Sequence, residues 1–321
     1  MPIGLALEAA IEAATDGPMP PGPGSDDPAQ IYYTSGTTGR PKGVRRGRAP
    51  SRGAVIAGAR RYGGAIGLDG SGPHLVTGPL YHAAPLGLAT YDLYAGAPMV
   101  IMDRFDALST LKAIETHQNA HTHLVPTMFV RMLRLSDAER SIHDLSSLTC
   151  VLHGAAPVSP PVKRDMIDWW GPVLLEYWGG SESGVVTLVD SETWLDHPGT
   201  VGRAIGSWEV FAADDDGQPL PAGHIGMLYC RNPSLGTVFE YHQAPEKTSA
   251  ARLDRGTFTL GDIGRVDSDG YVYLADRAAH TIISGGVNIY PAEVEAVLQE
   301  HPAIADLAVF GIPDEEWGEQ V

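Results

Sequence analysis

Residues 34–43 read Thr-Ser-Gly-Thr-Thr-Gly-Arg-Pro-Lys-Gly, and this stretch says more about the protein than any other ten residues of the chain. Its glycines and small hydroxyl residues leave backbone N–H groups free to surround phosphate oxygens, and Lys42 adds a cation. It is not a Walker A loop, because that pattern needs a second glycine five residues after the first, and Pro41 stands there. A shorter string of this kind would indicate an ordinary surface turn. The ten residues together predict a phosphate-binding loop.

Apolar runs and helical patterns alternate after this loop, up to about residue 200. Alternation of this kind predicts an α/β fold with layered sheets and flanking helices. A strand at 30–34 leads into the loop. Further strands are expected at 99–102, 123–125, 149–152 and 173–177, and helices at 52–66, 107–117, 127–135 and 159–169.

Short strand patterns separated by turn residues follow Val201, and they predict a small β module over about 201–275. After Asp276 the pattern changes to that of a starting α+β domain, with a helix at 291–299. The strands expected in these two parts lie at 208–212, 226–231, 257–259, 264–267, 271–274, 281–283 and 304–310. We therefore expect a lead-in over 1–29, a large domain over 30–276 and the start of a C-terminal domain over 277–321.

The composition limits what the protein can bind and where it works. Lys and Arg number 22 against 39 Asp and Glu, and this net charge of −17 argues against a nucleic-acid partner but not against one nucleotide. Hydrophobic residues make up 43%, a globular proportion, and no run of 18 apolar residues predicts a transmembrane segment. Cys150 and Cys230 fit small core positions in a reduced, cytoplasmic protein.

The 34–43 stretch resembles the phosphate loop of the adenylate-forming enzymes: acyl-CoA synthetases, firefly-type luciferases and the adenylation domains of peptide synthetases. Further segments resemble motifs of that family, in the same order, and the resemblance extends over residues 30–321. These segments are Pro79–His82, Trp178–Glu182, Leu260–Asp262 and the stretch from Arg277 to Glu295. Residues 284–295 are more similar to fatty-acyl and aryl-CoA ligases than to peptide-synthetase domains.

This resemblance implies an acid–thiol ligase of the AMP-forming kind. A fatty, aryl or sterol-side-chain carboxylic acid would be activated by ATP as an acyl-adenylate and then transferred to coenzyme A, with Mg²⁺ bound beside the phosphates. The first step gathers negative charge at the α-phosphate, so cations and hydrogen-bond donors are needed there.

The resemblance also implies roles for individual residues. The catalytic candidates are Lys42, Ser181 and Glu182, with Ser181 on the α-phosphate and Glu182 on Mg²⁺. Asp262 would hold the ribose hydroxyls, and Trp178 stands where the family usually has a Tyr that stacks on adenine. The nucleotide-binding set is Thr34, Ser35, Gly36, Thr37, Thr38, Gly39, Gly154, Ala155, Trp178, Asp262 and Arg277. The acyl and coenzyme A pocket would include His82 as a gate, with Gly285 and Gly286 in the pantetheine tunnel.

Each of these positions also has a purely structural interpretation. Trp178 can be a core residue, Glu182 a solvated loop carboxylate, and Asp262 a turn residue at the end of a strand. His82 can be a half-buried histidine with satisfied hydrogen bonds, and Gly154 can belong to a tight turn without a ligand.

The family pattern is incomplete in this sequence. Family members carry a long subdomain before the phosphate loop, and a late lysine on the substrate carboxylate and α-phosphate that would come after Val321. At the hinge, Ala279 stands where Asp or Lys is common. We therefore expect ATP binding with impaired ligase activity. The alternatives are a non-catalytic nucleotide-binding remnant, half of a split enzyme, or a luciferase-like or peptide-synthetase-like adenylation domain. The expected partners are the small-molecule acid and either a second copy of the chain in a homo-oligomer or a complementing chain.

Overall fold

The computed structural model describes residues 31–34, 42–47, 51–278, 280–284, 287–299, 301, 303–304, 307–314 and 317–321. The expected lead-in over 1–29 lies outside them. The helices are α2 (Arg52–Ala65), α3 (Ala83–Ala95), α4 (Ala107–His117), α5 (Pro126–Leu133), α6 (Asp137–Ser141), α7 (Pro160–Trp170), α8 (Ser191–Asp196), α9 (Pro245–Ala250) and α10 (Pro291–Gln299). The strands are β1 (Ile31–Thr34), β2 (Lys42–Arg46), β3 (His74–Val76), β4 (Met99–Ile101), β5 (His121–Leu124), β6 (Cys150–His153), β7 (Leu174–Gly180), β8 (Gly184–Asp190), β9 (Thr200–Ala204), β10 (Glu209–Ala213), β11 (Gly226–Arg231), β12 (Phe239–Tyr241), β13 (Thr257–Val266), β14 (Tyr271–Arg277), β15 (Ile282–Ser284), β16 (Val287–Ile289), β17 (Ile312–Asp314) and β18 (Gly318–Gln320).

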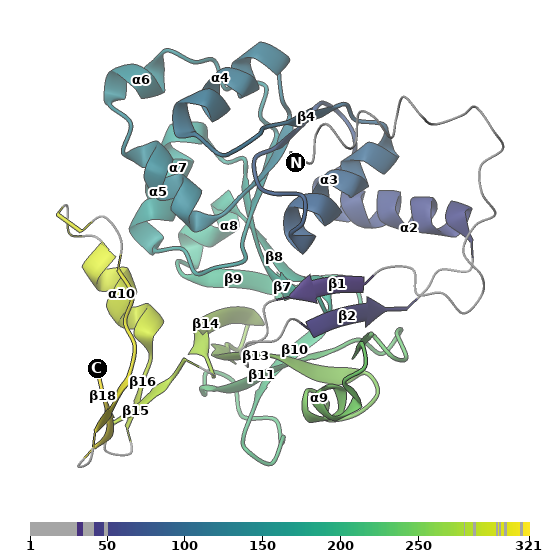
Figure 1. The fold of residues 1–321 in the computed structure, drawn as a ribbon, viewed down its shortest axis with the longest axis vertical. Helices are drawn as coiled ribbons and strands as arrows, with labels where there is room; N and C mark the ends of the chain where they lie inside the picture. Colours follow the sequence, from purple (N-terminus) through teal and green to yellow (C-terminus); the bar gives the residue numbers. More distant parts are fainter. Residues whose placement is uncertain are drawn as a thin grey trace, which may run out of the picture.

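Eleven strands form one continuous sheet in the order β10-β11-β13-β14-β9-β8-β7-β6-β5-β3-β4 (Figure 1). The strands from β4 to β7 pair in parallel, and β7 pairs with β8 in antiparallel fashion. This mixture of a parallel half with helical connections and an antiparallel half confirms the predicted α/β class. The strands of the expected β module thus continue the sheet of the preceding part. The boundaries at residues 29 and 276 stay a prediction.

Helices cover both faces of the parallel half (Figure 1). On one face, α4, α5 and α7 bury Leu111, Phe129 and Met166 against the sheet residues Leu124 and Val151. The other face carries a second buried cluster beside α2 and α3, made of Ile66, Leu68, Leu88, Cys150, Leu152, Tyr177 and Val185. Strands covered on both sides are expected for a parallel sheet, and every residue of β5 and β6 is buried. No helix of the described ranges is long and apolar enough to cross a membrane.

Helix α3 was not among the predicted helices. Its segment contains Pro85 and Gly87, which disfavour a helix in a sequence pattern. Pro85 lies in the first turn, however, where its missing N–H leaves no intrahelical hydrogen bond unmade. Packing against the sheet then outweighs the low propensity of the segment.

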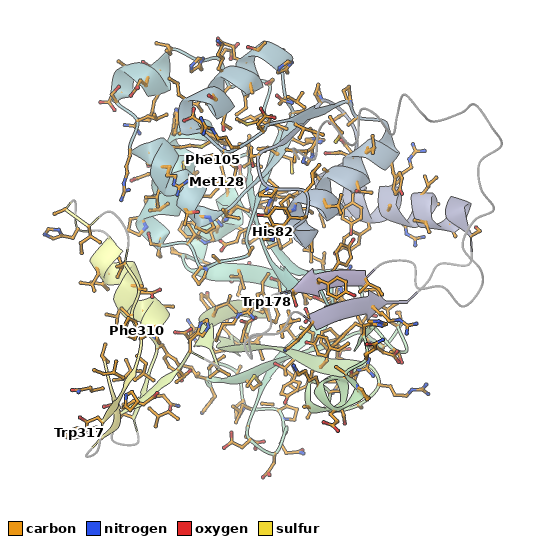
Figure 2. The ribbon with its side chains drawn as sticks, in the orientation of Figure 1. His82, Phe105, Met128, Trp178, Phe310 and Trp317 are labelled. Carbon is orange, nitrogen blue, oxygen red and sulfur yellow. The ribbon has the colours of Figure 1, made fainter. Side chains whose placement is uncertain are left out.

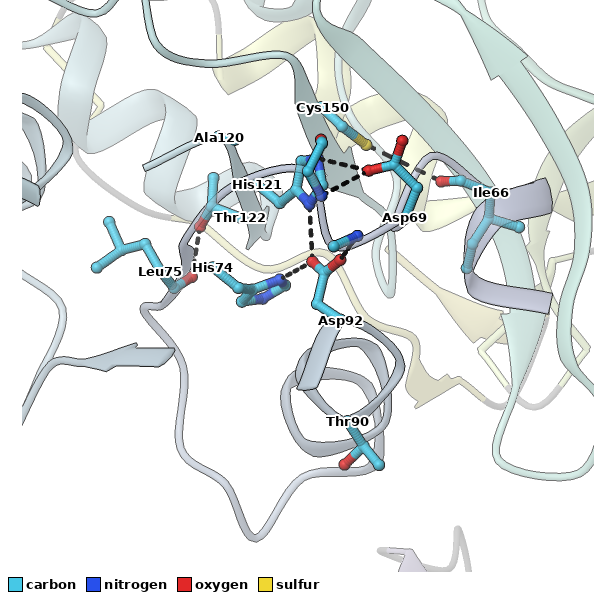
Figure 3. Close-up of polar contacts among 12 residues, drawn as sticks. Ile66, Asp69, His74, Leu75, Thr90, Asp92, Ala120, His121, Thr122 and Cys150 are labelled. Atoms are coloured by element: carbon cyan, nitrogen blue, oxygen red, sulfur yellow. Dashed lines mark hydrogen bonds and ion pairs between the residues drawn. The ribbon is translucent and has the colours of Figure 1, made fainter. Parts of the chain in front are cut away.

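A buried carboxylate fixes α3 to the start of two strands (Figure 3). Asp92 Oδ2 lies 2.7 Å from His74 Nδ1 at the first residue of β3 and 2.9 Å from His121 Nδ1 at the first residue of β5. Asp92 Oδ1 accepts a hydrogen bond from the backbone N–H of Gly70 at 3.0 Å. Burial alone would raise the pKa of Asp92, but the hydrogen bonds from His121 and His74 hold it below its usual range. The three contacts hold the helix, both strands and the preceding loop together.

A second sheet joins strands that are far apart in sequence. It has three strands in the order β1-β2-β12, all antiparallel, so residues 31–34 and 239–241 lie on either side of β2. Val44 and Phe239 of this sheet are buried in the same cluster as Trp178 and Val186 of the large sheet. The three-stranded sheet is therefore attached to the large sheet by an apolar interface.

Two strand predictions were wrong. The strands expected at 257–259 and 264–267 are a single strand, β13, whose pairing with β14 continues through a register shift at Ile263/Gly264. The strand expected at 304–310 is absent from its described residues, 304 and 307–310. The backbone N–H of Val309 donates to Glu295 Oε1 at 2.8 Å, so a side chain of α10 takes the place of a neighbouring strand. The C-terminal strands that do form pair in the order β16-β15-β18-β17.

Candidate nucleotide-binding site

The candidate site lies where the large sheet changes from parallel to antiparallel pairing. Strand β7 ends at Gly180 and β8 starts at Gly184, so the Trp178–Glu182 motif covers the end of β7 and the first two residues of the turn between them. Gly179 must be a glycine, because a Cβ there would lie 1.9 Å from the carbonyl oxygen of Gly184. Ligands of open α/β sheets bind outside the carboxyl ends of parallel strands, and this turn follows the carboxyl end of β7, which pairs in parallel with β6.

The neighbouring strand β6 supplies the second turn of the site, at Gly154 and Ala155. A Cβ on Gly154 would lie 2.6 Å from the carbonyl oxygen of Tyr177, so the two strand ends touch through their backbones. Ala155 has a φ of +68°, a left-handed conformation that costs an alanine roughly 1–2 kcal/mol. Ala155 is exposed, and strain of this kind gathers at ligand-binding sites.

Asp262 is held from two sides. The indole Nε1–H of Trp178 donates to Asp262 Oδ2 at 2.8 Å, and Arg277 Nε lies 2.9 Å from Asp262 Oδ1. The carboxylate is 6% exposed. Burial raises the pKa of Asp262, although Arg277 and the Trp178 hydrogen bond act in the opposite direction. The structure thus brings together three residues that the sequence predicted for one ligand.

Trp178 occupies a buried position. It is 5% exposed and packs in one cluster with Val44, Val186 and Phe258. In Figure 2, Trp178 lies beside β1 and β2, and His82 lies above them at the start of α3. The indole is thus both a core residue and a hydrogen-bond donor to the site. Its stacking on adenine stays a prediction.

A second group of polar side chains surrounds Glu182. The hydroxyl of Tyr241 donates to Glu182 Oε1 at 2.8 Å, and Lys42 Nζ lies 5.1 Å from the centre of the Tyr241 ring. Burial and the negative charge of Glu182 raise the pKa of Tyr241, so its hydroxyl stays protonated as a donor. A Cβ on Gly180 would lie 3.0 Å from Glu182 Oε2 and 3.1 Å from Leu260 Cδ2, so Glu182 lies beside the segment of β13 that carries Asp262. The charge of Glu182 also contributes to the raised pKa of Asp262.

Arg46 ties β2 to the Trp178–Glu182 turn. Its Nε donates to the carbonyl oxygen of Ser181 at 2.7 Å, and its Nη2 to that of Gly180 at 3.1 Å. Arg46 and Tyr241 were not predicted from the sequence. Arg46 shares one face of β2 with Lys42, so the alternation along that strand could have drawn attention to it. Tyr241 had no such signal, because β12 reaches the site only by pairing with β2.

The remaining predicted residues divide into two groups. Thr34 pairs with Lys42 at the end of the β1–β2 ladder, so the two ends of the phosphate-loop segment lie side by side. His82 is exposed, precedes α3 and contacts the ring of Tyr81 at 4.4 Å between ring centres. The residues that lie outside the described ranges are Ser35, Gly36, Thr37, Thr38, Gly39, Ala279, Gly285 and Gly286. The roles predicted for all site residues stay predictions.

Comparison with known families agrees with this geometry. The AMP-binding enzyme family matches residues 4–239, and the AMP-binding enzyme C-terminal domain matches residues 293–321. The chain belongs to the AMP-binding enzyme family. This membership confirms the resemblance to adenylate-forming enzymes.

Curated members of the family are similar along almost the whole chain. The Medium/long-chain-fatty-acid–CoA ligase FadD8 of Mycobacterium tuberculosis is 35% identical over 99% of this chain and 55% of its own length. Indoleacetate–CoA ligase of Aromatoleum aromaticum is 35% identical over 99% of this chain and 61% of its own. The chain thus spans little more than half the length of the curated relatives it matches.

Solved structures of AMP-binding enzymes share the fold. The o-succinylbenzoate CoA synthetase of Bacillus subtilis, in complex with an acyl-adenylate intermediate, has a TM-score of 0.78 and 30% identity. That match covers 92% of this chain and 58% of the other. MatB of Rhodopseudomonas palustris, in its ATP-bound form, has a TM-score of 0.81 at 29% identity and matches 98% of this chain and 60% of its own.

Proposed function

We propose that this chain binds ATP with Mg²⁺ and activates a carboxylic acid as an acyl-adenylate for transfer to coenzyme A. The observation that carries this is the convergence of Asp262, Glu182 and Lys42 on the turn between β7 and β8. Relatives named as fatty-acid, indoleacetate and feruloyl–CoA enzymes support a substrate with an aliphatic or aryl group on its carboxyl carbon.

The side chains around Glu182 fit a magnesium ion. The Tyr241 hydroxyl occupies Oε1, and a Cβ on Gly180 would lie 3.0 Å from Oε2, so the glycine keeps the backbone from crowding that oxygen. Mg²⁺ prefers carboxylate oxygens together with phosphate oxygens of the substrate. When bound, the ion would neutralise part of the triphosphate charge.

The residues of the chain then have distinct tasks. The Asp262 carboxylate accepts hydrogen bonds from the vicinal ribose hydroxyls, which fixes the nucleoside. Lys42 favours negative charge beside it, and Arg46 holds the Gly180–Ser181 turn in place through the two carbonyl oxygens. A carboxylate oxygen of the acid attacks the α-phosphorus and pyrophosphate leaves. The thiol of coenzyme A then attacks the acyl carbon, loses its proton and displaces AMP.

Binding and turnover are tested separately. Calorimetry should detect MgATP binding to the chain, and Asp262→Ala should weaken it by about 1.5–3 kcal/mol, because two hydroxyls lose a charged acceptor. Asp215→Ala removes an exposed carboxylate of a turn and should leave the affinity unchanged. Equal affinity in wild type and Asp262→Ala would contradict the site.

Turnover is measured as pyrophosphate release and thioester formation with a panel of fatty, aryl and sterol-side-chain acids. Acid-dependent pyrophosphate release that precedes thioester formation is the expected result. Release of pyrophosphate with no thioester would favour an adenylation domain of the peptide-synthetase kind. Binding of MgATP with neither product would favour a nucleotide-binding module.

A further inference from the structure

The Trp178 indole makes a contact whose consequence goes beyond holding the core together. We propose that Trp178 is a positioning residue that fixes the Asp262 carboxylate toward the ribose and so makes the site select ribonucleotides over deoxyribonucleotides. This rests on the proposed function, because it concerns the same nucleotide site. It differs from the stacking role, in which Trp178 would act on the base.

The geometry of the indole favours a role toward Asp262. Trp178 is 5% exposed and packs with Val44 of β2 and Val186 of β8. Its one polar atom, Nε1, lies 2.8 Å from Asp262 Oδ2, a normal length for a strong hydrogen bond. Only its N–H therefore reaches the polar side of the site.

The hydrogen-bonding capacity of the carboxylate explains why this contact matters. A carboxylate offers about four acceptor positions on its two oxygens. Among the described residues, Trp178 takes one position on Oδ2 and Arg277 one on Oδ1, which leaves one position on each oxygen. Two vicinal hydroxyls need two acceptor positions in a fixed relation. Because both oxygens are held, the carboxylate cannot rotate about its terminal bond without losing a partner.

Removal of the indole donor would release one of these oxygens. In Trp178→Phe the aromatic volume is largely kept, but Oδ2 of Asp262 loses its partner and its fixed direction. Asp262 would then accept hydroxyls less selectively, while Arg277 still holds Oδ1. Tyr at this position places its polar atom at the end of a differently shaped ring, so it would not reproduce the contact.

The test compares three nucleotides in the full chain. Calorimetry gives the Kd of MgATP, Mg-2′-deoxy-ATP and Mg-3′-deoxy-ATP, and each deoxy/ribo ratio measures what one hydroxyl contributes. In wild type we expect ratios of about tenfold to a hundredfold, as for hydrogen bonds to a charged group. In Trp178→Phe at least one ratio should fall by about threefold or more, as expected for groups coupled in one network. Asp262→Asn should also lower the ratios.

A matched control separates positioning from packing. Phe258→Leu removes volume from the same buried cluster without touching Asp262, and its ratios should equal those of wild type. If Trp178→Phe weakens all three nucleotides equally, the ratios stay unchanged and the positioning role is overturned in favour of stacking or packing.

A second measurement does not depend on a nucleotide. In the ¹⁵N–¹H spectrum, the indole resonance that disappears in Trp178→Phe should be shifted downfield in wild type and should move in Asp262→Asn. An indole resonance whose chemical shift is the same in wild type and Asp262→Asn would overturn the contact, and with it the positioning role. If wild type binds none of the three nucleotides, the proposed function and the ribose selectivity fail together, whereas this spectrum still decides whether Trp178 holds Asp262.

Discussion

The hydroxyl of Tyr241 orients the Glu182 carboxylate through one hydrogen bond. Tyr241→Phe keeps the ring under Lys42 and removes only the hydrogen bond to Glu182 Oε1. We expect MgATP binding to weaken by about 1 kcal/mol, with a higher Mg²⁺ concentration needed for half-saturation, because the carboxylate is no longer oriented. Calorimetry at several Mg²⁺ concentrations measures this.

The matched control for this substitution is Tyr33→Phe. Tyr33 is 66% exposed on β1, so loss of its hydroxyl should change neither affinity nor Mg²⁺ dependence. An identical Mg²⁺ dependence in Tyr241→Phe and wild type would show that Glu182 needs no support from Tyr241.

At the residue scale, the sequence predicted which motif residues meet at the site better than which other residues support them. Asp262, Trp178 and Arg277 belong to motifs, and the structure brings them within hydrogen-bond distance. Tyr241 could not be predicted, because its role depends on which strands pair across the molecule, whereas Arg46 carried a signal only in sharing one face of β2 with Lys42. A short segment such as β12, with three residues, carries no local pattern that reveals its neighbour.

Among the elements, α7 and β7 are joined by a buried ion pair. Lys163 Nζ lies 2.6 Å from Glu176 Oε2 and 4.6 Å from the centre of the Trp194 ring, and both charged residues are buried. Burial raises the pKa of Glu176 and lowers that of Lys163, while their attraction acts against both shifts. The pair therefore stabilises the fold only while both partners are present.

Substitution of one partner is expected to cost more than substitution of both. Lys163→Met should lower the free energy of unfolding by about 3–5 kcal/mol, because it leaves the buried Glu176 charge with only the His153 ring nearby, at 4.0 Å, and burial lowers the pKa of that histidine. Lys163→Met with Glu176→Met should recover most of that loss. Urea unfolding of wild type, both single variants and the double variant gives the comparison. A double variant that loses the sum of the two single losses would mean that the pair is not coupled.

The contact between α3 and the β3 and β5 strands predicts an acid-dependent stability. The pKa of Asp92 is lowered in the folded protein, so its contribution is present above the unfolded value and is lost as pH falls through the folded value. Asp92→Asn should lower stability at pH 7 by about 1–3 kcal/mol and flatten the loss of stability below about pH 4. Urea unfolding between pH 7 and pH 3 measures both effects.

The control for the loss of stability at acid pH is Asp168→Asn, which removes an exposed carboxylate on α7. Its stability should follow wild type at every pH. If Asp92→Asn loses as much stability at acid pH as wild type does, that loss belongs to other carboxylates.

At the scale of the element, α2, α4, α5 and α7 and the parallel strands β4, β5, β6 and β7 formed close to where the sequence predicted them, whereas the parallel strand β3 was not predicted. Helix α4 ends at the predicted residue, His117, and β11 has the predicted bounds. The patterns failed where tertiary contacts override local preference. Helix α3 forms in spite of Pro85 and Gly87, and the segment that ends at Phe310 remains outside any strand because Glu295 takes the N–H of Val309.

The whole molecule carries a net charge of −17. Repulsion among like charges destabilises a compact state, and salt screens it over about 8 Å at 0.15 M, compared with about 30 Å at 0.01 M. We expect the Tm to rise by roughly 2–4 °C between these NaCl concentrations, a shift that about 1 kcal/mol produces in large domains. Choline chloride should act in the same way as NaCl. A Tm that falls or stays constant would show that favourable ion pairs dominate the electrostatics of folding.

At the largest scale, alternation along the chain predicted an α/β molecule, but not that one sheet would run through it. Strand β9 pairs with β8 on one side and with β14 on the other, so the antiparallel strands continue the parallel ones. Periodicity identifies strands, whereas the choice of neighbours depends on which edges remain free after the core has packed. That choice is made by contacts distant in sequence, which no local pattern contains.

The hydrogen bonds from Arg46 to the turn after β7 can form only after the ribosome has synthesised both partners. Arg46 and Ser181 are separated by 135 residues, and a chain that grows at about 5–20 residues per second needs roughly 7–27 s to make them. During that interval the nascent β2 strand has neither this turn nor its β12 neighbour to pair with. Its unpaired edge would be open to chaperones and to other nascent chains. Slow codons between those of Arg46 and Ser181 would therefore lengthen the time during which this edge is exposed.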